Sequence, residues 1–194
     1  MGRVLLDFSE EKALEPWFPR KEDMELARQI IFRSGDWLAV DAGALTEEEA
    51  LEKWRSEIPG RMKDDLETMF ENWHTVLTPI DGMAALIRDL KEAGYPCYLL
   101  SNTSMRFYTY YREVEALRLL DGYLISAEHH LAKPDPAIYR KLAELFGLEL
   151  ATCYFVDDTA DNIRTARDMG MEAFCFAYDV DALRADMRRK GIAI

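Results

Sequence analysis

The stretch CYFVDDTADNIRTARDMG, residues 153–170, decides the fold class of this chain. Its first part is a short apolar run that ends on two aspartates, and its second part places apolar residues three or four positions apart before a glycine. The first pattern predicts a buried β-strand, and the second predicts an amphipathic helix that ends at Gly170. A strand that passes directly into a helix is the repeating unit of a parallel α/β sheet.

The same alternation of strand and helix runs through the chain from Thr78 onward. We expect further strands in YPCYLLS, GYLIS and EAFCFA, and further helices in IDGMAALIRDLKEAG, SMRFYTYYREVEALRLL, PAIYRKLAELFGL and residues 182–189. Strands joined by helices of this length form right-handed crossovers and a buried parallel sheet. The sequence therefore predicts an α/β protein with a doubly wound parallel sheet, a Rossmann-like core.

Residues 9–78 show a purely helical pattern. All four tryptophans lie in this block, apolar residues recur at helical spacing among many charges, and Thr46 with Glu49 predicts a capping box. If Arg3 to Asp7 belongs to the core, the block is an insertion. We then expect an α/β core domain of residues 1–8 and 79–194 and a helical cap domain of residues 9–78.

Bulk properties narrow the class of partner. The 194 residues carry a net charge of −12, which disfavours nucleic acid and anionic membranes because both require clustered Lys and Arg. No apolar run approaches the length of a membrane span, and the odd, scattered cysteines, Cys97, Cys153 and Cys175, suggest small buried hydrophobic residues in a reducing compartment. We expect a cytoplasmic monomer or homodimer that acts on a small molecule.

Polar residues gather where the predicted strands end. Ser101 and Asn102 follow one strand, Lys133 lies in the loop after the next, and Asp157 and Asp158 end the third. The carboxyl ends of parallel strands form the ligand-binding edge of such sheets. Adjacent carboxylates suit Mg²⁺, and a hydroxyl, an amide and an ammonium suit a phosphoryl group. Each group alone could serve only to cap a helix, form a turn or carry surface charge, whereas their joint appearance favours a site.

These residues lie in motifs that resemble a known family. L-L-S-N at 99–102, K-P-D-P-A-I-Y at 133–139 and F-V-D-D-T-A-D-N at 155–162 are similar, in order and spacing, to motifs two, three and four of the haloacid dehalogenase-like hydrolases. W-x-x-x-D-A-G-A-L-T-E-E-E-A at 37–50 also resembles the cap of the alpha-D-glucose-1-phosphate phosphatase-like branch.

The resemblance implies a Mg²⁺-dependent phosphatase of a small phosphorylated metabolite, such as a sugar phosphate, that works through an aspartyl-phosphate intermediate. By the same resemblance, Asp157 and Asp158 hold the metal, and Lys133 and Asp158 take part in catalysis. Lys133, Ser101 and Asn102 contact the phosphate, while Trp37 and Asp41 of the cap help to select the leaving group. Asp161 either orients the metal shell or caps its helix.

The first motif of the family, an apolar strand that ends in a nucleophilic Asp, admits two registers here. Asp7 follows Val4-Leu5-Leu6 and could be that nucleophile, but Ser9 then stands where the family has Asp or Gly. If Gly2 instead matches the glycine of Asp-x-Gly, the nucleophile would precede Met1. The second register fits the spacing to the cap better, so we expect the first motif to be truncated at Met1, with Asp7 only a poor substitute.

Other functions remain open from the sequence. A metal-independent haloacid dehalogenase has the same fold, but the Asp157-Asp158 pair favours a phosphatase. A phospho-accepting receiver domain also gathers acids, a hydroxyl and a lysine, but its acid pair comes first along the chain and it has no helical cap. A catalytically inactive phosphate-binding homologue is the third alternative, which applies if the chain truly lacks a nucleophile.

Overall fold

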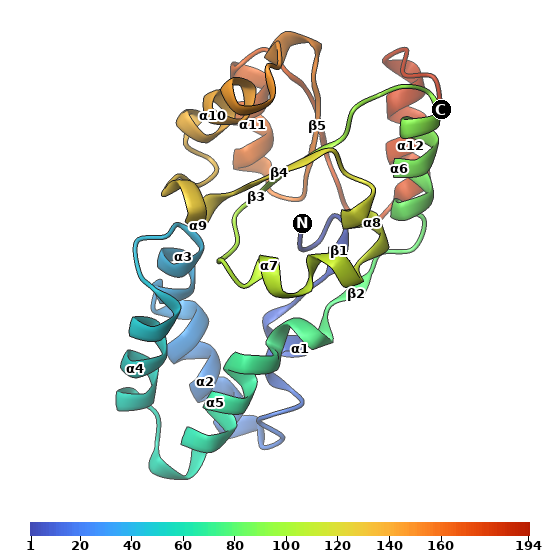
Figure 1. Ribbon diagram of the computed structural model, residues 1–194. Helices are drawn as coiled ribbons and strands as arrows, with labels where there is room; N and C mark the ends of the chain where they lie inside the picture. The colour runs from blue at the N-terminus through green and yellow to red at the C-terminus, as the bar shows by residue number, and fades with distance from the viewer.

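The computed structural model describes residues 1–194 as a helical block joined to an α/β core (Figure 1). The helical block contains α1 (Glu10–Leu14), α2 (Lys21–Arg28), α3 (Asp36–Asp41), α4 (Glu47–Glu57) and α5 (Lys63–Asn72). A π-helical segment at Gln29–Arg33 extends α2, and 3₁₀ turns at Gly60–Met62 and Trp73–Val76 flank α5. Gly35 adopts a left-handed conformation (φ 90°) and separates the π-helical segment from α3.

The helical block has a hydrophobic core of its own. Fourteen buried residues between Leu14 and Trp73 form one cluster, in which Trp54 is fully buried. The predicted capping box is confirmed: Glu49 N–H donates to Thr46 Oγ1 over 3.1 Å, and Thr46 N–H donates to Glu49 Oε2 over 2.9 Å. This separate core supports the division that we propose, with a cap at residues 9–78 and a core at 1–8 and 79–194.

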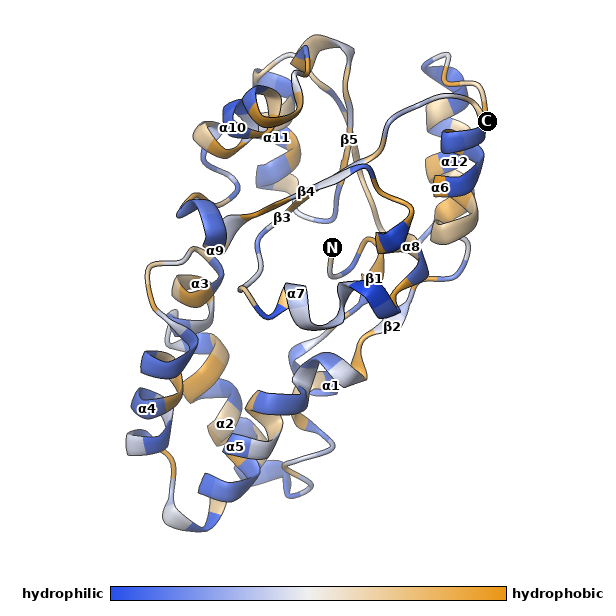
Figure 2. Ribbon diagram, viewed as in Figure 1, coloured by the Kyte–Doolittle hydropathy of each residue, from blue (hydrophilic) through white to orange (hydrophobic).

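The predicted parallel strands are confirmed as β3 (Tyr98–Ser101), β4 (Gly122–Ile125), β5 (Tyr154–Asp157) and β6 (Glu172–Cys175). Helices cover both faces of these strands: α10 (Pro136–Phe146) and α11 (Ala160–Asp168) lie on one side, α6 (Met83–Glu92) and α12 (Val180–Arg189) on the other (Figure 1). Successive residues of β3 alternate between the two layers, since Leu99 packs with α6 and Leu100 with α10. Figure 2 shows apolar segments on the inward sides of these helices.

The strands form two parallel ladders rather than one continuous sheet. Strand β3 pairs with β4 in the register Ser101 to Ile125, and β5 pairs with β6 in the register Asp157 to Cys175. No ladder joins β3 to β5, although both strands are largely buried. The facing edges of β3 and β5 are therefore each without a strand partner.

The segment Arg3 to Asp7 does not join either parallel ladder. Strand β1 (Leu6–Asp7) pairs antiparallel with β2 (Thr78–Pro79), where the chain enters and leaves the helical block. Leu6 is fully buried and contributes to the core, while Gly2 forms only an isolated bridge with Leu6. The chain therefore passes from the α/β core to the helical block at β1 and returns at β2, beside it.

Two expectations about local structure are wrong. The helix expected across residues 104–120 is broken into α7 (Phe107–Tyr110), a 3₁₀ turn (Tyr111–Glu113) and α8 (Glu115–Arg118), because Val114 adopts an extended conformation. Packing of the Phe107, Tyr111 and Tyr123 rings, with centroids 5.3–5.4 Å apart, accompanies this break. None of the three cysteines is fully buried as expected: Cys175 is exposed, and Cys97 and Cys153 are half-buried. No helix has the length and apolar character needed to span a membrane.

Candidate active site

The centre of the site is a buried ion pair that links the ends of β3 and β5. Lys133 Nζ donates to Asp157 Oδ2 over 2.6 Å and to the Leu100 carbonyl oxygen over 2.9 Å. The Lys133 and Asp157 side chains are only 6% and 5% exposed. Burial would raise the pKa of Asp157, but the Lys133 ammonium and three hydrogen-bond donors outweigh it and hold this pKa below its ordinary value.

The other oxygen of Asp157 is held by residues that open α11. Asp157 Oδ1 accepts hydrogen bonds from Thr159 N–H and from Asn162 Nδ2, each over 2.9 Å. Asn162 is buried, and its carbonyl oxygen accepts a hydrogen bond from Tyr139 OH over 2.9 Å. The sequence analysis missed Asn162, although its place one helical turn after the Asp157-Asp158 pair was a usable signal.

Asn102 holds the loop that carries Lys133. Its Nδ2 donates to the Lys133 carbonyl oxygen and its Oδ1 accepts from Lys133 N–H, both over 2.8 Å. Both polar atoms of this side chain therefore contact backbone, so its role in the structure is to position Lys133. Ser101 is 2% exposed and lies beside Asn102 at the end of β3.

Asp158 is the more accessible of the two adjacent carboxylates. Its side chain is 21% exposed, and Oδ2 lies 3.5 Å from Arg3 Nη1. Asp161 points elsewhere: it forms an exposed ion pair with Arg164 over 2.7 Å, and Thr159 rather than Asp161 occupies the N-cap position of α11. The structure thus brings Ser101, Lys133, Asp157 and Asp158 together and leaves Asp161 outside.

The first residues of the chain enter the same cluster. The Met1 amino group is buried near Lys133, Asp157 and Asp158, and burial, followed by the Lys133 charge, lowers its pKa to about 5. Arg3 has a left-handed backbone (φ 61°), so that Met1 to Leu6 forms a compact turn in which the Met1 carbonyl oxygen accepts the Leu5 and Leu6 amides.

Asp7 lies apart from the residues that are expected to bind phosphate and Mg²⁺. It belongs to β1 at the crossing between the two parts of the protein, where it forms an ion pair with Lys12 and accepts a hydrogen bond from Tyr178 OH over 3.1 Å. The Lys12 hydrogen bond, which outweighs the effect of burial, lowers the pKa of Asp7. Both carboxylate oxygens are therefore engaged away from Lys133 and Asp157.

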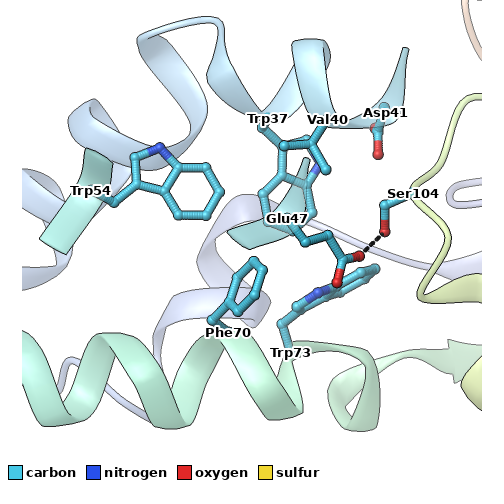
Figure 3. Close-up of a pocket in the computed structure, with 8 residues that line it drawn as sticks. All are labelled: Trp37, Val40, Asp41, Glu47, Trp54, Phe70, Trp73 and Ser104. Atoms are coloured by element: carbon cyan, nitrogen blue, oxygen red, sulfur yellow. Dashed lines mark hydrogen bonds between the residues drawn. The ribbon is translucent and has the colours of Figure 1, made fainter. Parts of the chain in front are cut away.

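Trp37 and Asp41 of α3 line the space between the helical block and the core. Two adjoining cavities share Trp37, Asp41 and Trp73, and the larger, of about 70 Å³, reaches Gly2 and Asn102. The Trp37 and Trp73 rings meet almost at right angles, with centroids 5.1 Å apart. Figure 3 shows the smaller cavity, in which the Asp41 and Glu47 carboxyl groups lie on either side of Ser104.

Three contacts hold α3 and α4 against the core, and the sequence analysis did not anticipate them. Glu47 Oε1 accepts from Ser104 Oγ over 2.6 Å, and Glu47 Oε2 accepts from Arg106 Nη2 over 2.8 Å. Ser126 Oγ donates to the Asp41 carbonyl oxygen and accepts Thr103 N–H over 2.9 Å. The loop after β3 is therefore tied directly to the helices that carry Trp37 and Asp41.

The acidic pair can be tested as a site for Mg²⁺. Mg²⁺ is held in proteins by one or two carboxylates and completes its shell with water and phosphate oxygens. Asp158 offers a carboxylate with one weak partner, and Asp157 lies next to it under the charge of Lys133. Asp158 therefore fits such an ion directly, whereas both Asp157 oxygens already accept hydrogen bonds from Lys133, Thr159 or Asn162. No cluster of three or more His, Cys, Asp or Glu side chains arranged for a metal is present.

Comparison with known proteins identifies the family of this chain. A haloacid dehalogenase-like hydrolase family model matches residues 8–170. The chain is 27% identical to the chloroplastic flavin mononucleotide hydrolase 1 of Arabidopsis thaliana over 180 residues, which cover 91% of this chain and 68% of that protein. It is also 27% identical to the sesquiterpene phosphatase astK of Aspergillus oryzae over 142 residues, which cover 73% of this chain and 72% of that protein.

Solved structures show the same fold. A HAD family enzyme from Bacteroides thetaiotaomicron, in complex with magnesium and inorganic phosphate, superposes with a TM-score of 0.73 at 22% identity, covering 94% of this chain and 95% of that one. A predicted HAD-like hydrolase from Porphyromonas gingivalis gives 0.74 at 19% identity, covering 97% and 94%. Because the family model spans most of the chain, this protein belongs to the haloacid dehalogenase-like hydrolases.

Proposed function

We propose that this hydrolase is a phosphatase of a small phosphorylated metabolite, with Mg²⁺ as its cofactor and an aspartyl phosphate as its intermediate. The observation that carries the proposal is the buried Lys133 ammonium, which bridges Leu100 at the end of β3 to Asp157 at the end of β5 beside the accessible Asp158. A fixed positive charge and two carboxylates at this edge suit a bound phosphoryl group. The two relatives named as a hydrolase of flavin mononucleotide and a phosphatase support it.

The residues have distinct roles in this proposal. Lys133 stabilises negative charge on the phosphoryl group, and Asn102 holds Lys133 through both of its backbone polar groups. Ser101 contacts the phosphate, while Asp158 and Asp157 hold the Mg²⁺. When bound, the ion supplies further positive charge to the phosphoryl oxygens. Trp37 and Asp41 contact the leaving group, since their cavity reaches Asn102.

We propose that the attacking carboxylate belongs to a residue that precedes Met1 in the full coding sequence. The unpartnered edges of β3 and β5 support this, because a strand placed between them would pair with both and end beside Lys133. The engagement of Asp7 by Lys12 and Tyr178 also supports it. We further propose that the protein belongs to the alpha-D-glucose-1-phosphate phosphatase-like branch, on the ground of its cap motif. The three free cysteines support a cytoplasmic location.

Hydrolysis of 4-nitrophenyl phosphate with Mg²⁺ tests these proposals. We would compare this chain, its Asp7→Asn variant and a version extended by the upstream coding sequence. Activity only in the extended version is the expected result. Activity in this chain that disappears in Asp7→Asn would instead identify Asp7 as the nucleophile. Phosphate binding without hydrolysis by any version would identify an inactive homologue, and hydrolysis of a haloacid without metal would identify a dehalogenase.

A further inference from the structure

The Asp41 carboxyl group has an unusual environment for an acidic side chain. The groups facing it are Ser104, whose backbone amide donates to it, the Glu47 carboxylate from α4 and Tyr110 from α7. The Arg106 guanidinium pairs with Glu47 over 2.8 Å, and no side-chain cation forms an ion pair with Asp41. Burial raises the pKa of Asp41 to about 7, and the Glu47 charge acts in the same direction.

Asp41 also lies close to the place proposed for the phosphate. The cavity of about 70 Å³ is lined by Asp41 at one end and by Asn102 and Thr103 at the other. A phosphate dianion at Lys133, which Asn102 holds, and an ionised Asp41 would repel each other across a poorly solvated space. A positive charge between the phosphate and the Asp41 carboxylate would offset this repulsion.

The walls of the cavity suit such a positive charge. Trp37 and Trp73 line it together with Asp41, and their rings stand at 73° to each other. Phe8 forms a further aromatic wall. Indole rings attract organic cations through their electron-rich faces, by about 0.5–2 kcal/mol per contact. Aromatic walls with one carboxyl group that lacks a cationic partner resemble a receptor for an ammonium group.

From this arrangement, and resting on the proposed function, we infer that the substrate is a phosphomonoester whose leaving group carries a protonated amine, which binds Asp41 in the cavity that Trp37 and Trp73 line. The size of the cavity favours a short amino alcohol over a large leaving group. Entry of the ammonium beside Asp41 stabilises the ionised carboxylate, so ligand binding at neutral pH releases a proton from Asp41.

Isothermal titration calorimetry of the unmodified chain with Mg²⁺ at pH 7 tests this inference without turnover. The ligands are inorganic phosphate, 2-aminoethyl phosphate and its neutral match, 2-hydroxyethyl phosphate. We expect 2-aminoethyl phosphate to bind about tenfold more tightly than 2-hydroxyethyl phosphate. Titrations in two buffers of different ionisation enthalpy should report more proton release for 2-aminoethyl phosphate than for 2-hydroxyethyl phosphate, because burial raises the pKa of Asp41 and the bound ammonium lowers it again.

Variants sharpen the result. Asp41→Asn should abolish both the preference for the amine and the additional proton release without weakening the binding of inorganic phosphate, because it removes a negative charge near the phosphate. Glu48→Gln, an exposed neighbour of Glu47 on α4, should behave as the wild type. Equal or tighter binding of the hydroxyl ligand to the wild type would overturn the inference alone. Failure of inorganic phosphate to bind would overturn the proposed function and this inference with it.

Discussion

Replacement of Lys133 by methionine tests the role of the buried ion pair in holding the site together. The substitution keeps a long side chain but leaves the Asp157 carboxylate, 5% exposed, without its cation. Removing one partner of a buried pair costs about 3–5 kcal/mol. Because Thr159 and Asn162 still donate to Asp157, we expect a loss near the lower limit, about 3 kcal/mol. With a urea m-value of about 2 kcal/mol/M, the unfolding midpoint should fall by about 1.5 M.

Lys141→Met is the matched control for this experiment. Lys141 forms an exposed pair with Glu144 over 3.3 Å, in which the glutamate side chain is 73% exposed. Such surface pairs contribute about 0–1 kcal/mol, so the control should barely move the urea midpoint. A Lys133→Met variant that loses no more stability than Lys141→Met would refute the account of the ion pair.

The pH dependence of Lys133→Met provides a second readout. In the wild type the pKa of Asp157 is lowered, so its ionised form contributes stability that is present above the ordinary Asp pKa and is lost as the pH falls through the lower, folded value. Without Lys133, burial raises this pKa, and protonation relieves the unpaired charge. The stability difference between wild type and variant should therefore shrink as the pH falls from 7 toward 4. A constant difference would contradict the mechanism.

Three further perturbations test the helical block and its contacts with the core. Gly43→Ala should lower the free energy of unfolding, measured in urea, by about 1–3 kcal/mol. Gly43 has φ 71°, and a Cβ added there would lie 2.5 Å from the Ala127 carbonyl oxygen. Gly60→Ala is the control, because Gly60 has open space around it. Thr46→Ala should lower the thermal midpoint through a loss of about 1 kcal/mol from the capping box, whereas Ser56→Ala, on the exposed side of α4, should not. Since the pKa of Asp41 is raised to about 7, its contribution to stability should decrease as the pH rises from 4 through 7, and Asp41→Asn should flatten the thermal midpoint measured between pH 5 and 8; an unchanged slope would exclude Asp41 as its source.

The strands and the edge that holds the site could be predicted because they depend on local patterns. Strands β3 to β6 are short apolar runs in the sequence. The carboxyl ends of parallel strands meet at one edge of the sheet, whatever path the connecting segments take. Asp157, Asp158 and Lys133 could therefore be placed together before any contact was known. The break at Val114 could not, because the packing of Phe107 and Tyr111 against Tyr123 overrides the helical spacing of residues 104–120.

Contacts between distant segments were beyond sequence reasoning. Glu47 contacts Ser104 and Arg106, which lie 57 and 59 positions away in the sequence, and nothing in the run Glu47-Glu48-Glu49 marks the first glutamate as the one that contacts the core. The role of Asn102 was also missed in part, since its amide suggests a phosphate ligand while its atoms contact the Lys133 backbone. Such pairings depend on how the cap rests on the core, which local patterns do not encode.

Binding of inorganic phosphate in the presence of Mg²⁺ tests the central claim most directly, namely that the edge formed by β3 and β5 is a phosphoryl site. Calorimetry should show one phosphate per chain, a loss of at least about tenfold in affinity for Asp158→Asn, and no change for Asp161→Asn, whose carboxylate is exposed and paired with Arg164. Equal affinity in all three proteins, or binding that is independent of Mg²⁺, would contradict the account.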